Sequence, residues 1–288
     1  MHNNKDMSDT SAPSGSIAQI IDIDNVIRQK NPRLAGMIPG FVLSYIKRIV
    51  HQDDVNYELS TFKHLGSIDF CKHVIYDKFN IGTGSEGLEN IPKTEGAILV
   101  ANHPLGGMDA LALVIELSKV RQDFKFVVND ILLHLPSLKP IFKGVNTMGK
   151  TSKEALHALN ALFASDELTV IFPAGLVSRK QKDGVIRDLE WRKTFVTQAK
   201  KHNKAVIPVF IDAPPLSKRF YGINKWRQKL GIKANLELFY LVDEQYRLKN
   251  KHIDIHFGAP IPPDTFDRSK TDKQWAEWVK ERMYALKS

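Results

Sequence analysis

A histidine and an aspartate six residues apart carry the most chemical information in this sequence, in the segment Asn102-His103-Pro104-Leu105-Gly106-Gly107-Met108-Asp109. An apolar run over residues 97–101 precedes it, so we expect a strand to end at the histidine and a helix to begin near the aspartate. An imidazole accepts a proton near neutral pH, and a carboxylate within reach fixes its tautomer and stabilises the imidazolium. His103 is therefore a candidate general base and Asp109 its orienting acid. The alternative is a helix start beside a surface histidine.

The elements around this pair are expected to form an α/β fold with a mostly parallel central sheet covered by helices, because strand and helix patterns alternate from residue 87 onward. Strands are predicted over residues 97–101, 125–128, 145–148, 168–172, 205–211, 236–242 and 252–257. Helices are predicted over residues 109–120, 131–135, 153–164, 191–201 and 272–287. Active sites of such sheets lie at the carboxyl ends of strands. His103, the segment Pro173-Ala174-Gly175 and Pro208 are therefore expected at one edge.

The N-terminal part of the chain shows a different pattern. Ile20, Ile23 and Ile27 recur at helix spacing, and Pro32 and Pro39 divide the helical run into pieces. Residues 17–86 are therefore predicted to form a helical subdomain, and residues 87–288 the α/β domain. Residues 1–16 are polar and lack the apolar stretch of a signal peptide, so we expect a flexible tail.

Composition narrows the class of protein. The net charge of +9 favours an acidic partner, such as an anionic membrane, an acidic carrier protein or a phosphorylated substrate. No nucleic-acid-binding motif is present, so no nucleic acid partner is expected. The single cysteine, Cys71, fits a reducing compartment. The histidines show no ligand spacing, so no metal is expected. No uncharged apolar run is long enough to predict a membrane-spanning helix.

One motif suggests a different enzyme. The segment Gly144-Val145-Asn146-Thr147-Met148-Gly149-Lys150-Thr151 satisfies the phosphate-loop pattern, and a predicted helix follows it. The run that ends in Asp212 could supply the acid on the magnesium side. Against this, Pro140 interrupts the strand expected before the loop, and Pro208 lies within the run before Asp212, where a central strand resists proline. A phosphate-loop NTPase therefore stays as an alternative.

Four segments in chain order resemble the four sequence blocks of the glycerolipid acyltransferase family. They are Asn102-His103 with Asp109, residues 144–150, Phe172-Pro173-Ala174-Gly175, and Val206-Ile207-Pro208-Val209. The resemblance covers about residues 87–262. It implies that His103 and Asp109 are catalytic and that a substrate site is formed by Asn102, Gly144, Phe172, Pro173 and Gly175. It further implies that Lys150 or Arg179 anchors an anionic head group or the phosphopantetheine region of a carrier.

Departures from the family pattern point to a divergent branch. Five residues rather than four separate His103 from Asp109, and two of the five are glycines. Lys150 stands where the second block usually ends in arginine, and Ala174 where the third block usually carries glutamate. Val177 takes the place of a frequent arginine. This branch is similar to the hemolysin-like and amino-lipid acyltransferases.

The resemblance implies an acyltransferase of lipid biosynthesis and phospholipid metabolism. Such an enzyme moves a fatty acyl group to the hydroxyl of a lysolipid, either a lyso-amino-lipid or a lysophospholipid. The donor would be an acyl carrier protein or coenzyme A thioester, which is a substrate, so no bound cofactor is expected. No Ser or Cys accompanies His103, so direct attack by the acceptor is expected.

A segment rich in cations and aromatic residues, 217–233, suits an anionic bilayer. The expected location is therefore cytoplasmic, peripheral on the inner face of the membrane. The same segment could instead dock an acidic acyl carrier or form an exposed loop with its aromatic residues turned into the core. A non-catalytic lipid-binding relative is a further alternative.

Overall fold

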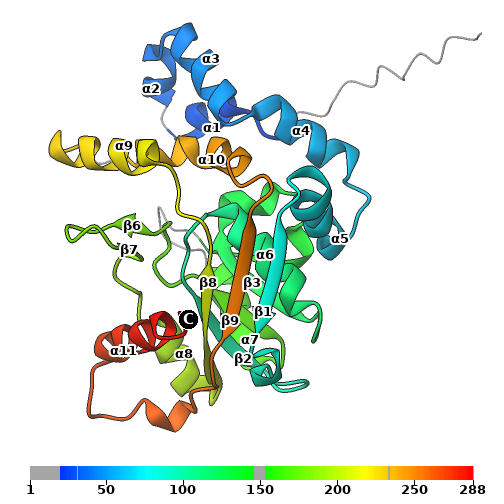
Figure 1. The fold of residues 1–288 in the computed structure, drawn as a ribbon, viewed down its shortest axis with the longest axis vertical. Coiled ribbons are helices and arrows are strands. Elements are labelled where there is room, and N and C mark those ends of the chain that lie inside the picture. Colours follow the sequence, from blue (N-terminus) through cyan, green and yellow to red (C-terminus); the bar gives the residue numbers. More distant parts are fainter. Residues whose placement is uncertain (1–19, 31, 146–152, 233, 288) are drawn as a thin grey trace, which may run out of the picture.

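The computed structural model describes residues 20–30, 32–145, 153–232 and 234–287, and its centre is a seven-stranded sheet (Figure 1). Along the sheet the order of strands is β1 (Gly82–Glu86), β9 (His252–Phe257), β8 (Ala205–Asp212), β2 (Ala97–Ala101), β5 (Leu168–Ile171), β3 (Phe124–Asn129) and β4 (Phe142–Val145). The strands from β8 to β4 are parallel; β9 is antiparallel to β8, and β1 is parallel to β9. The predicted mostly parallel α/β fold is confirmed. A short hairpin of β6 (Arg179–Lys180) and β7 (Ile186–Arg187) lies apart.

Both faces of the sheet are covered because its central strand is apolar throughout. Alternation along β2 sends Leu99 into one core and Ile98 and Val100 into the other. The first core contains α5 (Ser67–Lys72) and α6 (Gly107–Leu117). The second contains α8 (Thr194–His202) and α11 (Asp272–Tyr284). Helix α7 (Lys153–Ala164) was predicted with the same bounds.

The N-terminal helices are α1 (Ile23–Lys30), α2 (Pro32–Met37), α3 (Gly40–Ile49), α4 (Gln52–Thr61), α5 and the π-helical turn η1 (His73–Lys78). Leu59 and Phe70 of these helices belong to the same hydrophobic core as the sheet. The helical prediction for this region misses one element, since strand β1 lies within residues 17–86. Strand β1 was not predicted because glycine is unusual inside strands. The structure requires glycine here, since a Cβ at Gly82 would lie 2.4 Å from His252 Nδ1 and a Cβ at Gly84 would lie 2.5 Å from Asp254 Oδ1, both on strand β9. The division into two domains stays a prediction.

Two further expectations are wrong. Residues 236–242 form a 3-10 turn, η5 (Leu236–Tyr240), and helix α10 (Leu241–Tyr246) instead of a strand. A short apolar run does not distinguish strand from helix by its pattern alone. The helix expected over residues 131–135 is instead the 3-10 turn η3 (Asp130–His134). Further 3-10 turns are η2 (Leu88–Asn90), η4 (Lys139–Ile141) and η6 (Pro263–Thr265). The basic segment 217–233 contains helix α9 (Lys218–Lys229).

Pro208 lies inside strand β8 rather than at its end, contrary to the expectation that a central strand resists proline. Its carbonyl accepts a hydrogen bond from Gly258 N, so the nitrogen of Pro208 faces the same side, towards β9. The β8–β9 pairing stops one residue away, at Val209 and Phe257, and is resumed by a single bridge at Val206 and Ile261. Proline has no backbone N–H to donate, but at this position the pairing of β8 with β9 is irregular, so no hydrogen bond of the sheet is lost.

Candidate active site

His103 and Asp109 lie together in the loop between strand β2 and helix α6. Asp109 Oδ2 is 3.1 Å from His103 Nδ1. The Asp109 side chain is fully buried, whereas the His103 side chain keeps 19% of its surface exposed. An ionised carboxylate only accepts hydrogen bonds, so Nδ1 carries the hydrogen and Nε2 keeps a lone pair. This geometry is the one that a general base and its orienting acid require.

The loop is shaped by glycine and by the aspartate itself. Gly106 has φ +83°, a conformation that other residues rarely adopt. Asp109 Oδ2 accepts hydrogen bonds from the backbone nitrogens of Leu105 (2.9 Å) and Gly106 (3.1 Å), which fixes the carboxylate at the start of α6. The longer spacing between His103 and Asp109 is therefore accommodated by a turn that keeps the two side chains in contact.

A second buried acid, Asp188, bonds to the backbone of His103. Asp188 accepts hydrogen bonds from His103 N (3.2 Å), Ser178 Oγ (2.5 Å) and Trp191 Nε1 (2.9 Å). Ser178 N donates to the His103 carbonyl at 2.8 Å, so both backbone groups of His103 are fixed. Sequence reasoning missed Asp188 because it is one acid in a charged stretch without a distinctive spacing.

The electrostatic surroundings favour the protonated form of His103. Burial by itself lowers the pKa of His103, and Arg179 also lowers it. The charge and hydrogen bond of Asp109, together with the charge of Asp188, outweigh these effects and raise the pKa above its ordinary value. For Asp188 the balance is reversed, because its burial outweighs its hydrogen bonds and raises the pKa of its carboxyl.

The segment Phe172-Pro173-Ala174-Gly175 meets the histidine because strands β5 and β2 are neighbours, with Val100 paired to Ile171. The ring of Phe172 stacks on that of His103, with centroids 4.3 Å apart. The two segments were expected at one sheet edge, and the structure places them there.

A cavity of about 690 Å³ is lined by this edge of the sheet. His103, Phe172, Pro173 and Gly175 contribute to its wall. The rest of the wall is largely apolar and comes from the N-terminal helices, β3 and α6; examples are Val55, Leu59, Phe70, Val74, Leu111 and Val127. A cavity of this size and character suits a lipid chain.

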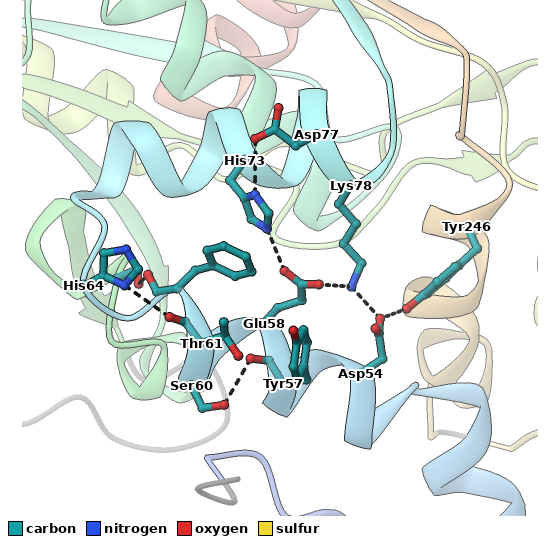
Figure 2. A network of polar contacts seen from close by, with 12 residues as sticks. Asp54, Tyr57, Glu58, Ser60, Thr61, His64, His73, Asp77, Lys78 and Tyr246 are labelled. Carbon is teal, nitrogen blue, oxygen red and sulfur yellow. Dashed lines mark hydrogen bonds and ion pairs between the residues drawn. The ribbon is translucent and has the colours of Figure 1, made fainter. Parts of the chain in front are cut away.

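A polar network joins the elements that form one side of the wall (Figure 2). Lys78 Nζ in η1 lies 2.6 Å from Asp54 Oδ2 and 3.0 Å from Glu58 Oε1, both in α4. The Tyr246 hydroxyl of α10 donates to Asp54, and His73 Nε2 lies 2.9 Å from Glu58 Oε2. Lys78, Asp54, Glu58 and Tyr246 all line the cavity.

Two of the predicted substrate-binding residues serve other purposes. Asn102 is buried, and its amide bonds to both the nitrogen (2.7 Å) and the carbonyl (2.9 Å) of Ile211, so it braces β2 against β8. Arg179 is also buried and lies 2.8 Å from Glu237 in η5. An arginine whose charge is paired inside the protein is unsuited to anchor a substrate.

The second block contributes less to the described site. Gly144 lies in β4 and is not among the cavity-lining residues that the structure describes, whereas its neighbour Phe142 is. Lys150 and most of the phosphate-loop pattern fall outside the described residues. The fourth block is part of the buried strand β8, where it supports the sheet.

Comparison with known proteins identifies the family. A family model described as Acyltransferase matches residues 25–288. The chain belongs to this acyltransferase family. It is 41% identical to the lyso-glycine lipid O-acyltransferase of Bacteroides thetaiotaomicron over 271 residues, which covers 93% of this chain and 97% of the relative. It is 39% identical to the protein of the same name from Phocaeicola vulgatus, over 93% and 95% of the two chains.

Among solved structures, the acyltransferase resembles the 1-acyl-sn-glycerophosphate (LPA) acyltransferase PlsC of Thermotoga maritima, with a TM-score of 0.45 and 19% identity over 85% of this chain and 95% of that chain. The family match decides between the alternatives that the sequence left open. The protein is an acyltransferase, in preference to an NTPase or a non-catalytic relative.

Two backbone amides close to His103 already donate hydrogen bonds in the acyltransferase. The nitrogen of Gly106 donates to Asp109, and the nitrogen of Gly175 donates to the Phe172 carbonyl at 2.9 Å. Each amide stabilises its own turn, so neither is free to stabilise a developing negative charge.

Proposed function

We propose that this acyltransferase moves a fatty acyl group from an acyl carrier protein or coenzyme A thioester to the hydroxyl of a lysolipid, with a lyso-amino-lipid as the acceptor. The names of two relatives that match nearly the whole chain, both lyso-glycine lipid O-acyltransferases, support this class of acceptor. The observation that carries the proposal is the His103–Asp109 pair, whose histidine lies on the wall of a largely apolar cavity.

In this mechanism His103 Nε2 takes the proton of the acceptor hydroxyl while that oxygen attacks the thioester carbonyl carbon. The tetrahedral intermediate collapses, the carbon–sulfur bond breaks, and the thiolate leaves with the proton from the imidazolium. Asp109 holds the ring and stabilises its positive charge during the transfer. The cavity holds the acyl chain and so brings the two reacting groups together. No covalent acyl-enzyme forms, because the acceptor hydroxyl attacks the thioester directly.

The acyltransferase acts in this proposal at the cytoplasmic, inner face of the membrane. None of the helices in the described part of the chain has both the length and the apolar character needed to cross a bilayer. Helix α9 exposes Lys225, Trp226 and Lys229, while Phe41 on α3 is 78% exposed. Mixed cations and aromatic residues of this kind favour binding to an anionic bilayer surface.

Substitution of His103 tests the proposal. We expect His103→Ala to lower acyl transfer from acyl carrier protein or coenzyme A thioesters to a lyso-glycine lipid by about 100-fold or more, because the base is lost. His252→Ala, at an exposed histidine on β9, is the matched control and should keep the wild-type rate. Circular dichroism and thermal melting verify that both variants fold. A folded His103→Ala protein with the wild-type rate would overturn the proposed base.

A further inference from the structure

The cavity contains one arginine that the mechanism does not use. Five of its described lining residues are Asp54, Glu58, Lys78, His103 and Arg192, the ones whose side chains carry charge or exchange protons near neutral pH. Lys78 is paired with both acids, and His103 serves as the base. For the Arg192 guanidinium, the described part of the chain supplies no ion pair or hydrogen bond. Arg192 therefore has the charge and the freedom to bind a ligand.

The position of Arg192 links it to the histidine. Its backbone nitrogen donates to the Pro173 carbonyl at 3.1 Å. Its guanidinium lies over Gly175, with Cζ and one terminal nitrogen 3.7 Å from the point that a Cβ of this glycine would occupy. Phe172, in the same turn, stacks on His103. One turn thus connects the Arg192 guanidinium and the proposed base on the wall of one cavity.

We propose that Arg192 forms an anion subsite that binds the carboxylate of the acceptor lysolipid; this inference rests on the proposed function. A glycine joined to a lipid through its amine keeps a free carboxylate, whose two oxygens match the planar fork of a guanidinium. At the network of Figure 2, Asp54 and Glu58 would repel such a head group. The charges therefore orient the acceptor with its head at Arg192 and its chain along the apolar wall.

A phosphate of the thioester donor has the same oxyanion chemistry, so the experiment must separate the two substrates. We suggest measuring KM for acceptor and donor in the wild type, Arg192→Gln, Arg192→Lys and the control Lys193→Gln, which removes an adjacent exposed cation outside the cavity wall. Each protein is assayed with N-acylated glycine lysolipid and with its carboxamide analogue, which lacks the negative charge.

We expect Arg192→Gln to raise the acceptor KM by about 10- to 100-fold and to leave the donor KM unchanged. For the wild type, the KM for the carboxamide analogue should exceed the KM for the carboxylate lysolipid by a similar factor. For Arg192→Gln, the two acceptors should have the same KM. Arg192→Lys should restore part of the loss, and Lys193→Gln should behave as the wild type.

Three results would overturn the subsite: an acceptor KM unaffected by Arg192→Gln, a rise confined to the donor KM, or equal use of both acceptors by the wild type. If the wild type acylates the carboxylate lysolipid and its carboxamide analogue equally well, the result contradicts the subsite but not the proposed function. A folded wild type that acylates neither lipid contradicts the proposed function and the subsite together.

Discussion

At the scale of single residues, the pKa of His103 is set by two opposing effects, its burial and the charges of neighbouring carboxylates. Burial disfavours the imidazolium, while the charges of Asp109 and Asp188 favour it, and the net result is a raised pKa of His103. A general base acts in its neutral form, so kcat/KM of the acyltransferase should fall as the pH decreases through this raised pKa.

We predict that Asp109→Asn shifts this acid limb of the pH profile to lower pH, because it removes the larger of the two carboxylate charges that raise the pKa of His103. The maximal rate should fall by about 100-fold to 10,000-fold, since the imidazolium loses its partner. The measurement is kcat/KM against pH. Asp183→Asn, an exposed acid in the β6–β7 turn, is the control. An acid limb at the wild-type pH in Asp109→Asn would contradict the assignment.

At the scale of elements, the wall of the cavity depends on three helical segments that are distant in sequence. The network of Figure 2 joins α4, η1 and α10 through Lys78, Asp54, Glu58 and Tyr246. Without Lys78, the two acids would face each other and the cavity with no cation between them. An unpaired charge in a partly buried site lowers stability more than the pair itself raises it.

Lys78→Met should therefore lower the free energy of unfolding by about 1–3 kcal/mol, less than for a fully buried pair because the Asp54 side chain is 43% exposed. Lys72→Met is the matched control: its amine lies 3.6 Å from Asp69, both side chains are exposed, and a change of at most about 0.5 kcal/mol is expected. Urea denaturation measures both. Equal effects of the two substitutions would show that the network does not stabilise the wall.

At the scale of the whole molecule, the proposed membrane-binding side chains gather at one end. Helices α2, α3 and α9 lie at the upper end of Figure 1, above the sheet. They expose Met37, Phe41 and Trp226, and Leu230 directly after α9 is also exposed. The Tyr45 hydroxyl of α3 lies 2.9 Å from that of Tyr240, directly before α10, which lines the cavity. The proposed membrane-binding side chains and the site are therefore adjacent in the fold.

Reversal of two charges on α9, Lys225→Glu with Lys229→Glu, should weaken binding to vesicles that contain anionic lipid by about 10-fold or more at low salt, and little to neutral vesicles. The control Arg268→Glu with Lys287→Glu makes the same change in net charge away from α9; residue 268 lies in the loop between β9 and α11 at the lower end of Figure 1. Vesicle sedimentation measures the difference. Equal losses for both double variants would contradict a membrane surface at α9.

The sequence by itself determined the fold class and the pair of His103 and Asp109, because both depend on patterns that are local in the chain. Apolar alternation specifies strands and helices, and a strand followed by a glycine turn places His103 near Asp109. The general rule for strand ends also placed the segment Pro173-Ala174-Gly175 at the same sheet edge as His103, whereas the stacking of Phe172 on His103 came from the structure.

Only the tertiary structure decided which cations and acids face the cavity. Arg179 is expected from the sequence to anchor an anionic group, but in the structure it is buried and bonds to Glu237, 58 residues away. Asp188 and Arg192 became visible as parts of the site only once folding placed them beside His103 and Gly175. Contacts between distant segments depend on the packing of whole elements, so the local pattern of residues does not predict these contacts.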